Sequence, residues 1–134
     1  NDCAPYKVIE SHIEKRKVFN ERTFNKRFEA VEAVGKNAIE IYISQWNDYL
    51  QKVIRGVESE NPQSIADTMH YLKGAFEYLS AERLAFLCEY CMSKTKEKGR
   101  LPIEKDDIIE LFKTEFTYFN EAIDTSFSGR GQNE

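Results

Sequence analysis

One histidine near the middle of the chain, His70, has neighbours that point to chemistry rather than to packing. It lies within residues 69–75 and is followed by Lys73 and Gly74. Neutral imidazole is a nucleophile near physiological pH. Glycine inside a helix costs about 1 kcal/mol relative to alanine, so a glycine one turn from the histidine needs a reason. The candidate chemistry is therefore nucleophilic attack by an imidazole, provided that the local structure turns His70 towards solvent.

The spacing of apolar residues around His70 predicts a helix that exposes it. At roughly 100° per residue, the apolar side chains cluster within about 40° of one direction. They are Ile65, Met69, Leu72, Phe76 and Leu79. His70 points about 140° away from this direction, which places it on the solvent side of the helix. Gly74 and Glu77 share its face, and Lys73 stands at the edge.

Apolar residues at helical spacing continue along most of the chain and predict the elements that hold this segment. The predicted helices cover residues 20–34, 39–57, 62–79, 81–98 and 104–127. Asn20, Asn61 and Ser80 are favourable N-caps, and Gly35 and Gly99 follow the predicted ends of two helices. No alternating strand pattern with turn residues occurs. Short links between long helices predict an all-α fold: an up-down-up-down four-helix bundle with a short additional N-terminal helix capping one end.

The same pattern divides the chain into three parts. Residues 1–18 form an N-terminal extension or linker with the spacing of a short helix, and its narrow apolar face predicts loose packing. Residues 19–127 form the bundle, and residues 128–134 are expected to be a disordered tail. Because the sequence starts with asparagine, an upstream anchor in a longer parent protein stays open.

Composition limits the classes of partner. The net charge is −4, so there is no general basic footprint and nucleic acid is not an expected partner. No apolar run approaches 18 residues and no signal-peptide pattern occurs, so we expect no membrane contact from this segment. The odd cysteine count favours a reducing compartment, and we expect a cytoplasmic location. The Cys88–Cys91 pair resembles half a zinc site, but both thiols fall on a core stripe, which favours buried structural cysteines.

Most catalytic motifs are missing, but the histidine segment resembles a known family. There is no GxSxG, no glycine-rich phosphate loop after a strand and no HExxH. Residues 70–74, His-Tyr-Leu-Lys-Gly, match the His-x-x-Lys-Gly core of histidine phosphotransfer (HPt) domains. Residues 79–84 and 87–89 resemble the loop and helix that follow in that family, and the resemblance covers residues 19–126. It implies a phosphorelay role, in which the domain accepts a phosphoryl group from one receiver aspartate and passes it to another.

The resemblance also implies what each residue near His70 does. His70 is the phosphorylated nucleophile, Lys73 offsets the phosphoryl charge, and Gly74 gives a partner steric access. Glu77 and Lys96 are candidates for further support of the phosphoryl group. A structural alternative is that Lys73 only forms an i, i+4 surface pair with Glu77. Glu77 itself holds Lys73 in place, repels the phosphoryl group or is simply solvated.

The implied activity depends on a partner. A bundle offers no water-excluded pocket, so the domain is expected to be a carrier and not a self-sufficient enzyme. The partner is the receiver domain of a response regulator or of a hybrid sensor histidine kinase. We expect this chain to bind no cofactor, to be a monomer, and to meet Mg²⁺ only in the partner's receiver site. A free-standing shuttle and the C-terminal domain of a membrane-bound hybrid kinase both fit.

Receiver docking in the family uses an apolar patch beside the histidine. The candidates for partner binding are Phe24, Phe28, Val31 and Asp67. The alternative for the apolar residues is that they close the end of the bundle.

Two residues depart from the family pattern. Ser80 occupies a loop position that is often glycine, and Met92 occupies a position where some members have a glutamine facing the histidine. Methionine cannot donate a hydrogen bond, so support of a phosphorylated His70 from this position is in doubt. The competing function is a non-enzymatic helical interaction module that binds a receiver or kinase without carrying phosphate. A metal-binding bundle is disfavoured because the chain has too few ligands.

Overall fold

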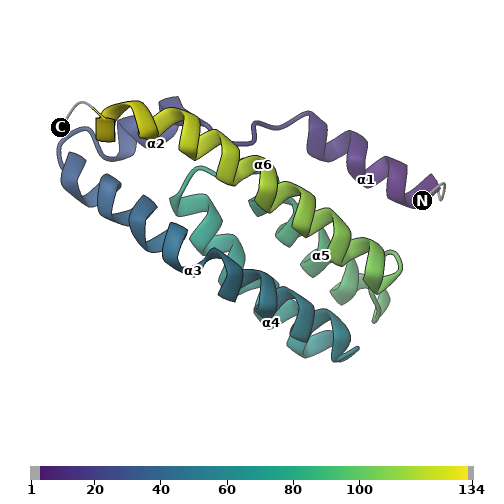
Figure 1. The fold of residues 1–134 in the computed structure, drawn as a ribbon. Coiled ribbons are helices and arrows are strands. Elements are labelled where there is room, and N and C mark those ends of the chain that lie inside the picture. The colour runs from purple at the N-terminus through teal and green to yellow at the C-terminus, as the bar shows by residue number, and fades with distance from the viewer. Residues whose placement is uncertain (1–3, 133–134) are drawn as a thin grey trace.

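The fold is entirely helical in a computed structural model, which describes residues 4–132 and the side chains of residues 4–127. This confirms the predicted all-α class. The described residues form α1 (Ala4–Glu14), α2 (Glu21–Arg27), α3 (Glu32–Glu58), α4 (Pro62–Tyr78), α5 (Glu82–Lys98) and α6 (Lys105–Gln132). In Figure 1, α3 to α6 lie alongside one another and successive helices run in alternating directions, while α2 lies across the end where α3 begins.

The core lies between the four long helices and is rich in aromatic rings. Phe76 of α4 packs edge-on against Phe116 of α6, with ring centroids 5.6 Å apart. Tyr42 of α3 packs in the same way on Phe119, at 5.0 Å. Its hydroxyl donates a hydrogen bond of 2.6 Å to Asn120 Oδ1, so burying this polar group leaves it satisfied. These contacts fix α6 against both α3 and α4, and α4 carries His70.

Three predicted helix ends are confirmed. Asn61 caps α4, its side chain accepting from the Ser64 backbone N–H at 3.0 Å, with proline in the first turn. Asn20 caps α2 in the same way. Gly99 ends α5 in the left-handed conformation, with φ at 71°.

The predicted stop at Gly35 is wrong. The short helix ends at Arg27, and Gly35 lies buried within α3, which begins at Glu32. The reason is a close approach: a Cβ on Gly35 would lie 2.8 Å from Cγ of Phe28. The glycine therefore lets the Phe28 ring reach the first turns of α3 and does not end a helix.

The role predicted for Ser80 is also wrong. Ala81 occupies the N-cap position of α5, and no side chain caps this helix. Ser80 adopts a left-handed conformation with φ at 58° and is buried. Its hydroxyl oxygen accepts hydrogen bonds from Thr23 at 2.9 Å and from Arg27 at 3.1 Å, so it is occupied by α2. Glycine adopts this conformation most easily, and here two hydrogen bonds stabilise serine in it.

The N-terminal segment packs more tightly than predicted. A short helix does form, and Ile9 and Ile13 of α1 are fully buried in the common core. The guanidinium carbon of Arg16 lies 3.7 Å from the ring centroid of Phe86 on α5. The narrow apolar face of α1 is sufficient for tight packing because Ile9 and Ile13 are both buried against the bundle.

The C-terminal helix is longer than predicted. α6 continues to Gln132, so residues 128–132 are helical where we expected disorder, and residues 133–134 lie outside the described part. No proline interrupts this segment, so the helix has no sharp stop after Phe127. None of the described helices is long and apolar enough to cross a membrane.

Cys88 and Cys91 are buried free thiols, in the core positions that their spacing predicts. Burial raises the pKa of Cys91 to about 12. Among the described residues, no group of three or more cysteine, histidine and carboxylate side chains could hold a metal ion. Cys3 lies outside the described part.

Candidate functional site

His70 lies on the solvent face of α4. Its neighbours Met69 and Leu72 are completely buried, whereas His70 is exposed. The outward orientation predicted from the apolar stripe is therefore confirmed. The helix that carries it is fixed at both ends, by the Asn61 cap and by contacts from α2, so the ring projects from a rigid element.

Gly74 follows one turn later and is exposed within the helix. A Cβ built on it meets no atom within 4 Å, so the packing of this chain does not require a glycine there. Two tyrosines flank it along α4: Tyr71 is 59% exposed and Tyr78 is 46% exposed. The ring of Tyr78 is supported by Phe28, at 5.3 Å between centroids. The surface beside His70 thus has a small central gap between two aromatic rings.

Lys73 is oriented by a residue on another helix. Its Nζ lies 2.8 Å from Oε1 of Glu89 on α5 and 3.9 Å from Oε2 of Glu77, the i, i+4 partner. The other oxygen of Glu89 accepts a hydrogen bond from Ser93. The hydrogen bond to Glu89 and the charge of Glu77 raise the pKa of Lys73. The hydrogen bonds from Lys73 and Ser93 hold the pKa of Glu89 below its usual range.

The remaining candidates for supporting a phosphoryl group differ in what they offer. Glu77 is exposed on the face of His70, as predicted. Lys96 is exposed on α5, and its charge also favours the ionised form of Glu89. Met92 is buried, so the position where some relatives place a glutamine adds only apolar surface to the core.

Of the four residues predicted to bind a partner, two are buried and two are exposed. Phe24 and Phe28 are 2% and 5% exposed, because they pack on each other, with ring centroids 4.8 Å apart. They close the end of the bundle, which is the structural alternative. Val31 is half exposed, and Asp67 is exposed and accepts a hydrogen bond from Gln63 at 2.8 Å. These two remain available to a partner.

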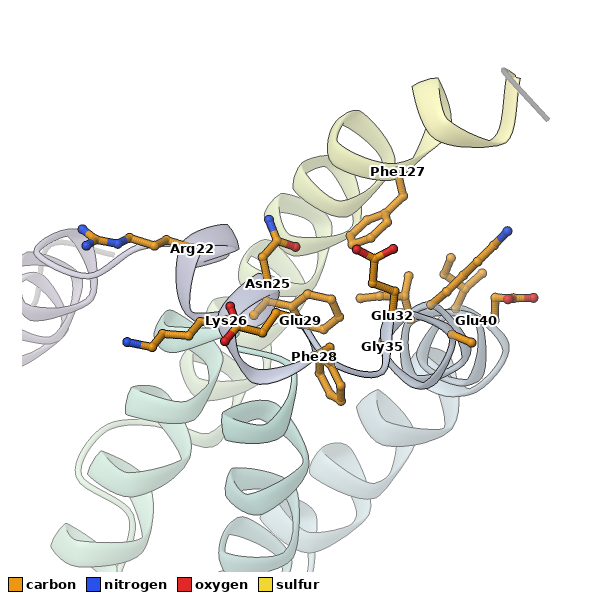
Figure 2. A pocket seen from close by; sticks show the side chains of 14 residues that line it. Arg22, Asn25, Lys26, Phe28, Glu29, Glu32, Gly35, Glu40 and Phe127 are labelled. Atoms are coloured by element: carbon orange, nitrogen blue, oxygen red, sulfur yellow. The ribbon is translucent and has the colours of Figure 1, made fainter.

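A groove runs over the closed end, between α2, the start of α3 and the end of α6. Figure 2 shows Phe127 pointing into it from α6, with Arg22 and Lys26 extending away on the α2 side. Its lining carries both signs of charge, with lysine and arginine as well as Glu29, Glu32 and Glu40. This mixed lining favours neither an anion nor a cation.

A second groove begins at Lys73 and is more closely tied to the histidine helix. It runs between α4, α5, α2 and the segment before α2, and Arg16, Arg27, Glu77 and Glu89 line it. Arg27 donates to the backbone oxygens of Glu77 and Tyr78, at 3.2 and 2.8 Å. It thereby caps the C-terminal end of α4.

Sequence reasoning gave no role to Tyr71, Tyr78, Glu89, Ser93 or Arg27. The exposure of the two tyrosines could have been predicted from the apolar stripe that places His70, because both lie on the opposite, solvent-facing side of the same helix. Glu89 and Ser93 share one face of α5 at i, i+4 spacing, but nothing in that spacing indicates that the face meets Lys73. Arg27 carries no local signal for its contact with α4.

Together, the fold and the site define a helical bundle that displays one histidine, with a lysine and a glycine beside it, on the solvent face of one helix. The model of the Hpt domain family matches residues 37–123, from early α3 to α6. The chain therefore belongs to the Hpt domain family. Comparisons with curated proteins and with solved structures gave no significant match.

Family membership supplies the general role. Hpt domains contain a histidine that transfers phosphoryl groups in phosphorelays, and they interact with receiver domains. They are phosphocarrier modules rather than classical enzymes. The family match starts inside α3, so α1 and α2 lie outside it.

Proposed function

We propose that His70 accepts a phosphoryl group from a receiver-domain aspartate and passes it to the aspartate of another receiver. One observation supports this most directly: His70 is exposed on a helix whose next turn, at Gly74, is open space. The concave site of a receiver can close over a convex surface of this kind without meeting a side chain at position 74. Tyr71 and Tyr78 offer apolar contact area on either side of the gap.

The transfer itself needs little covalent chemistry from this chain. The lone pair of a neutral imidazole nitrogen of His70 forms the N–P bond. The P–O bond to the receiver aspartate breaks, and its electron pair returns to the carboxylate. The proton on the other ring nitrogen stays on the ring. The reverse step loads the next receiver, and the two steps conserve the phosphoryl group.

The partner supplies what the bundle lacks. Phosphoryl transfer is promoted by positioning and by charge stabilisation, usually with Mg²⁺. We propose that the receiver contributes Mg²⁺ and excludes water, while this chain contributes the nucleophile and the positive charge of Lys73. Lys73 is three residues from His70, which is within reach of a group on its ring. We expect a monomer in the cytoplasm, which meets its receivers by diffusion or through a parent chain.

The test is a transfer assay with a matched histidine control. Receiver domains from the same genome are phosphorylated with acetyl phosphate and mixed with the purified domain. The wild type should take up acid-labile, base-stable label, and His70→Gln should take up none. His12→Gln should label as the wild type does, because His12 lies on α1 against Phe86, at 6.2 Å between ring centroids. Label on His70→Gln refutes the role of His70, and wild type that binds a receiver without labelling supports an interaction module instead.

A further inference from the structure

The ammonium group of Lys73 is held by α5 more closely than by its own helix. Nζ lies 2.8 Å from Glu89 Oε1, against 3.9 Å from Glu77 Oε2. Both partners of the shorter contact are partly exposed, with side chains 28% exposed for Lys73 and 41% for Glu89. In the unphosphorylated structure, therefore, Lys73 already has an anionic partner.

Glu89 is itself fixed in place. One of its oxygens accepts from Lys73, and the other accepts from Ser93, one turn further along α5. Engaging both oxygens limits the rotation of the carboxylate, so it presents the same atom to Lys73. Lys96 adds positive charge nearby and favours the carboxylate form of Glu89. The carboxylate of Glu89 thus stays charged and oriented. Both properties are needed for it to compete with a phosphoryl group for the ammonium group of Lys73.

A phosphoryl group on His70 would need the same cation. A phosphorylated side chain carries a charge of about −1.5 to −2 at neutral pH and strong acceptor oxygens. Lys73 is placed three residues from His70, so one ammonium group lies between two anionic partners on different helices. Each anionic partner draws Nζ towards its own helix, so the contact with Glu89 weakens the contact with the phosphoryl oxygens.

We propose that Glu89, oriented by Ser93, is a positioning residue that holds Lys73 on the α5 side of the site and competes with the phosphoryl group for it. This inference rests on the proposed function of His70. The competition makes phospho-His70 less stable than Lys73 alone would make it. It therefore sets the balance between keeping the phosphoryl group and giving it to a receiver, and favours onward transfer.

The first experiment measures that balance. The probe is the receiver domain that labels the wild type in the transfer assay, phosphorylated with acetyl phosphate. The plateau ratio of phospho-His70 to phospho-receiver is measured for each variant. Glu89→Gln should raise this ratio by about twofold to fivefold, the range for an exposed ion pair, and Ser93→Ala should raise it less. A ratio that is unchanged or lowered in Glu89→Gln overturns the proposal.

Two controls separate a specific effect from a general loss of charge. Glu97 lies on the same helix and pairs with Lys94 at 3.7 Å, so Glu97→Gln makes the same chemical change away from Lys73. It should leave the ratio at the wild-type value, and a matching rise there overturns the proposal. In a Lys73→Gln background, Glu89→Gln should no longer change the ratio. If Glu89→Gln still changes the ratio without Lys73, then Glu89 repels the phosphoryl group directly, and the proposal is overturned.

A second measurement needs no receiver. Titration of the lysine side-chain signals by NMR should give a lower pKa for Lys73 in Glu89→Gln than in the wild type, and no change in Glu97→Gln. If the pKa of Lys73 is the same in Glu89→Gln as in the wild type, the proposed ion pair between Glu89 and Lys73 is refuted. Failure of the proposed function is recognised separately, because wild type then takes up no label even if the lysine titration responds to Glu89.

Discussion

Replacing Gly74 tests whether this residue serves the fold or the partner, because the two roles predict opposite signs for stability. Gly74 lies in the interior of α4, is exposed, and has nothing within 4 Å of an added Cβ. Alanine there should stabilise the domain by about 0.5–1 kcal/mol, since it restricts the unfolded chain and clashes with nothing. For a domain of this size, that corresponds to a rise in Tm of roughly 2–6 °C.

A longer side chain at the same position should separate stability from transfer. Glutamine is also a better helix former than glycine, so Gly74→Gln should keep part of the gain in stability. Its side chain, however, would fill the space between Tyr71 and Tyr78 that the receiver is expected to enter. Displacing the reacting groups by about 1 Å can cost on the order of 100-fold in rate, so we expect transfer to fall by about tenfold to 100-fold.

The assay combines thermal unfolding followed by circular dichroism with the initial rate of label transfer from a phosphorylated receiver. Lys113→Gln, at an exposed position on α6, is the control, and it should change neither quantity appreciably. A loss of stability in Gly74→Ala would show that the glycine serves the fold. Wild-type transfer in Gly74→Gln would show that no partner uses the space.

Four further changes test the elements that hold the site. Ser80→Ala should destabilise by about 1–3 kcal/mol in urea unfolding, because two donors from α2 lose their acceptor, and Ser80→Gly should lose less because it relieves the left-handed backbone. Gly35→Ala should cost about 1–3 kcal/mol by the same measurement, since its Cβ would press on the Phe28 ring. Ile13→Ala should cost about 2–5 kcal/mol, whereas a loosely attached linker would give almost no change. Burial and a nearby glutamate raise the pKa of Glu115. The wild type should therefore lose stability relative to Glu115→Gln as the pH rises from about 4.3, the pKa in the unfolded chain, through the raised pKa of the folded state. If urea unfolding gives the same difference in free energy between the two proteins at low and at neutral pH, this prediction is contradicted.

The sign for Glu115 depends on its surroundings. It is buried on α6, and Oε1 has no hydrogen-bond partner. The nearest opposing charge is Arg83 of α5, at 3.9 Å, while Glu14 of α1 raises the pKa further. A carboxyl whose folded pKa is raised binds its proton more tightly in the native state. Its contribution to stability is therefore complete at low pH and is lost as the pH rises.

The position of His70 was predictable because it depends on local geometry alone. Helical spacing fixes which side chains share a face, and the apolar stripe shows which face is buried. Asn61 marks where the helix starts because its side chain accepts from a backbone N–H of the first turn, and the proline after it has no N–H that would be left unpaired. None of these inferences needs knowledge of a neighbouring helix. The same reasoning correctly placed Gly74 and Glu77 on the exposed face.

The differences from prediction arose where contacts join one helix to another. Gly35 has the features of a helix stop, yet it is there because Phe28 packs against it. Phe24 and Phe28 have the spacing of a surface patch, yet Phe127 of α6 packs on Phe24 and Tyr78 of α4 packs on Phe28. Ser80 has the chemistry of an N-cap, but α2 uses its hydroxyl. In each case the residue type suggested a role, but the helical spacing around the residue did not indicate which other element it contacts.

Support for the histidine helix extends beyond the region that matches the family. Arg27 of α2 donates to the last backbone oxygens of α4 and to Ser80 in the turn that follows. The backbone N–H of Asn20 also donates to the backbone carbonyl oxygen of Ser80, at 2.9 Å. The end of α4 that carries Gly74 and Tyr78 is thus fastened by residues that precede the match. The transfer proposed for His70 depends on positioning more than on covalent chemistry, so we expect those residues to contribute to it by holding the end of α4 in place.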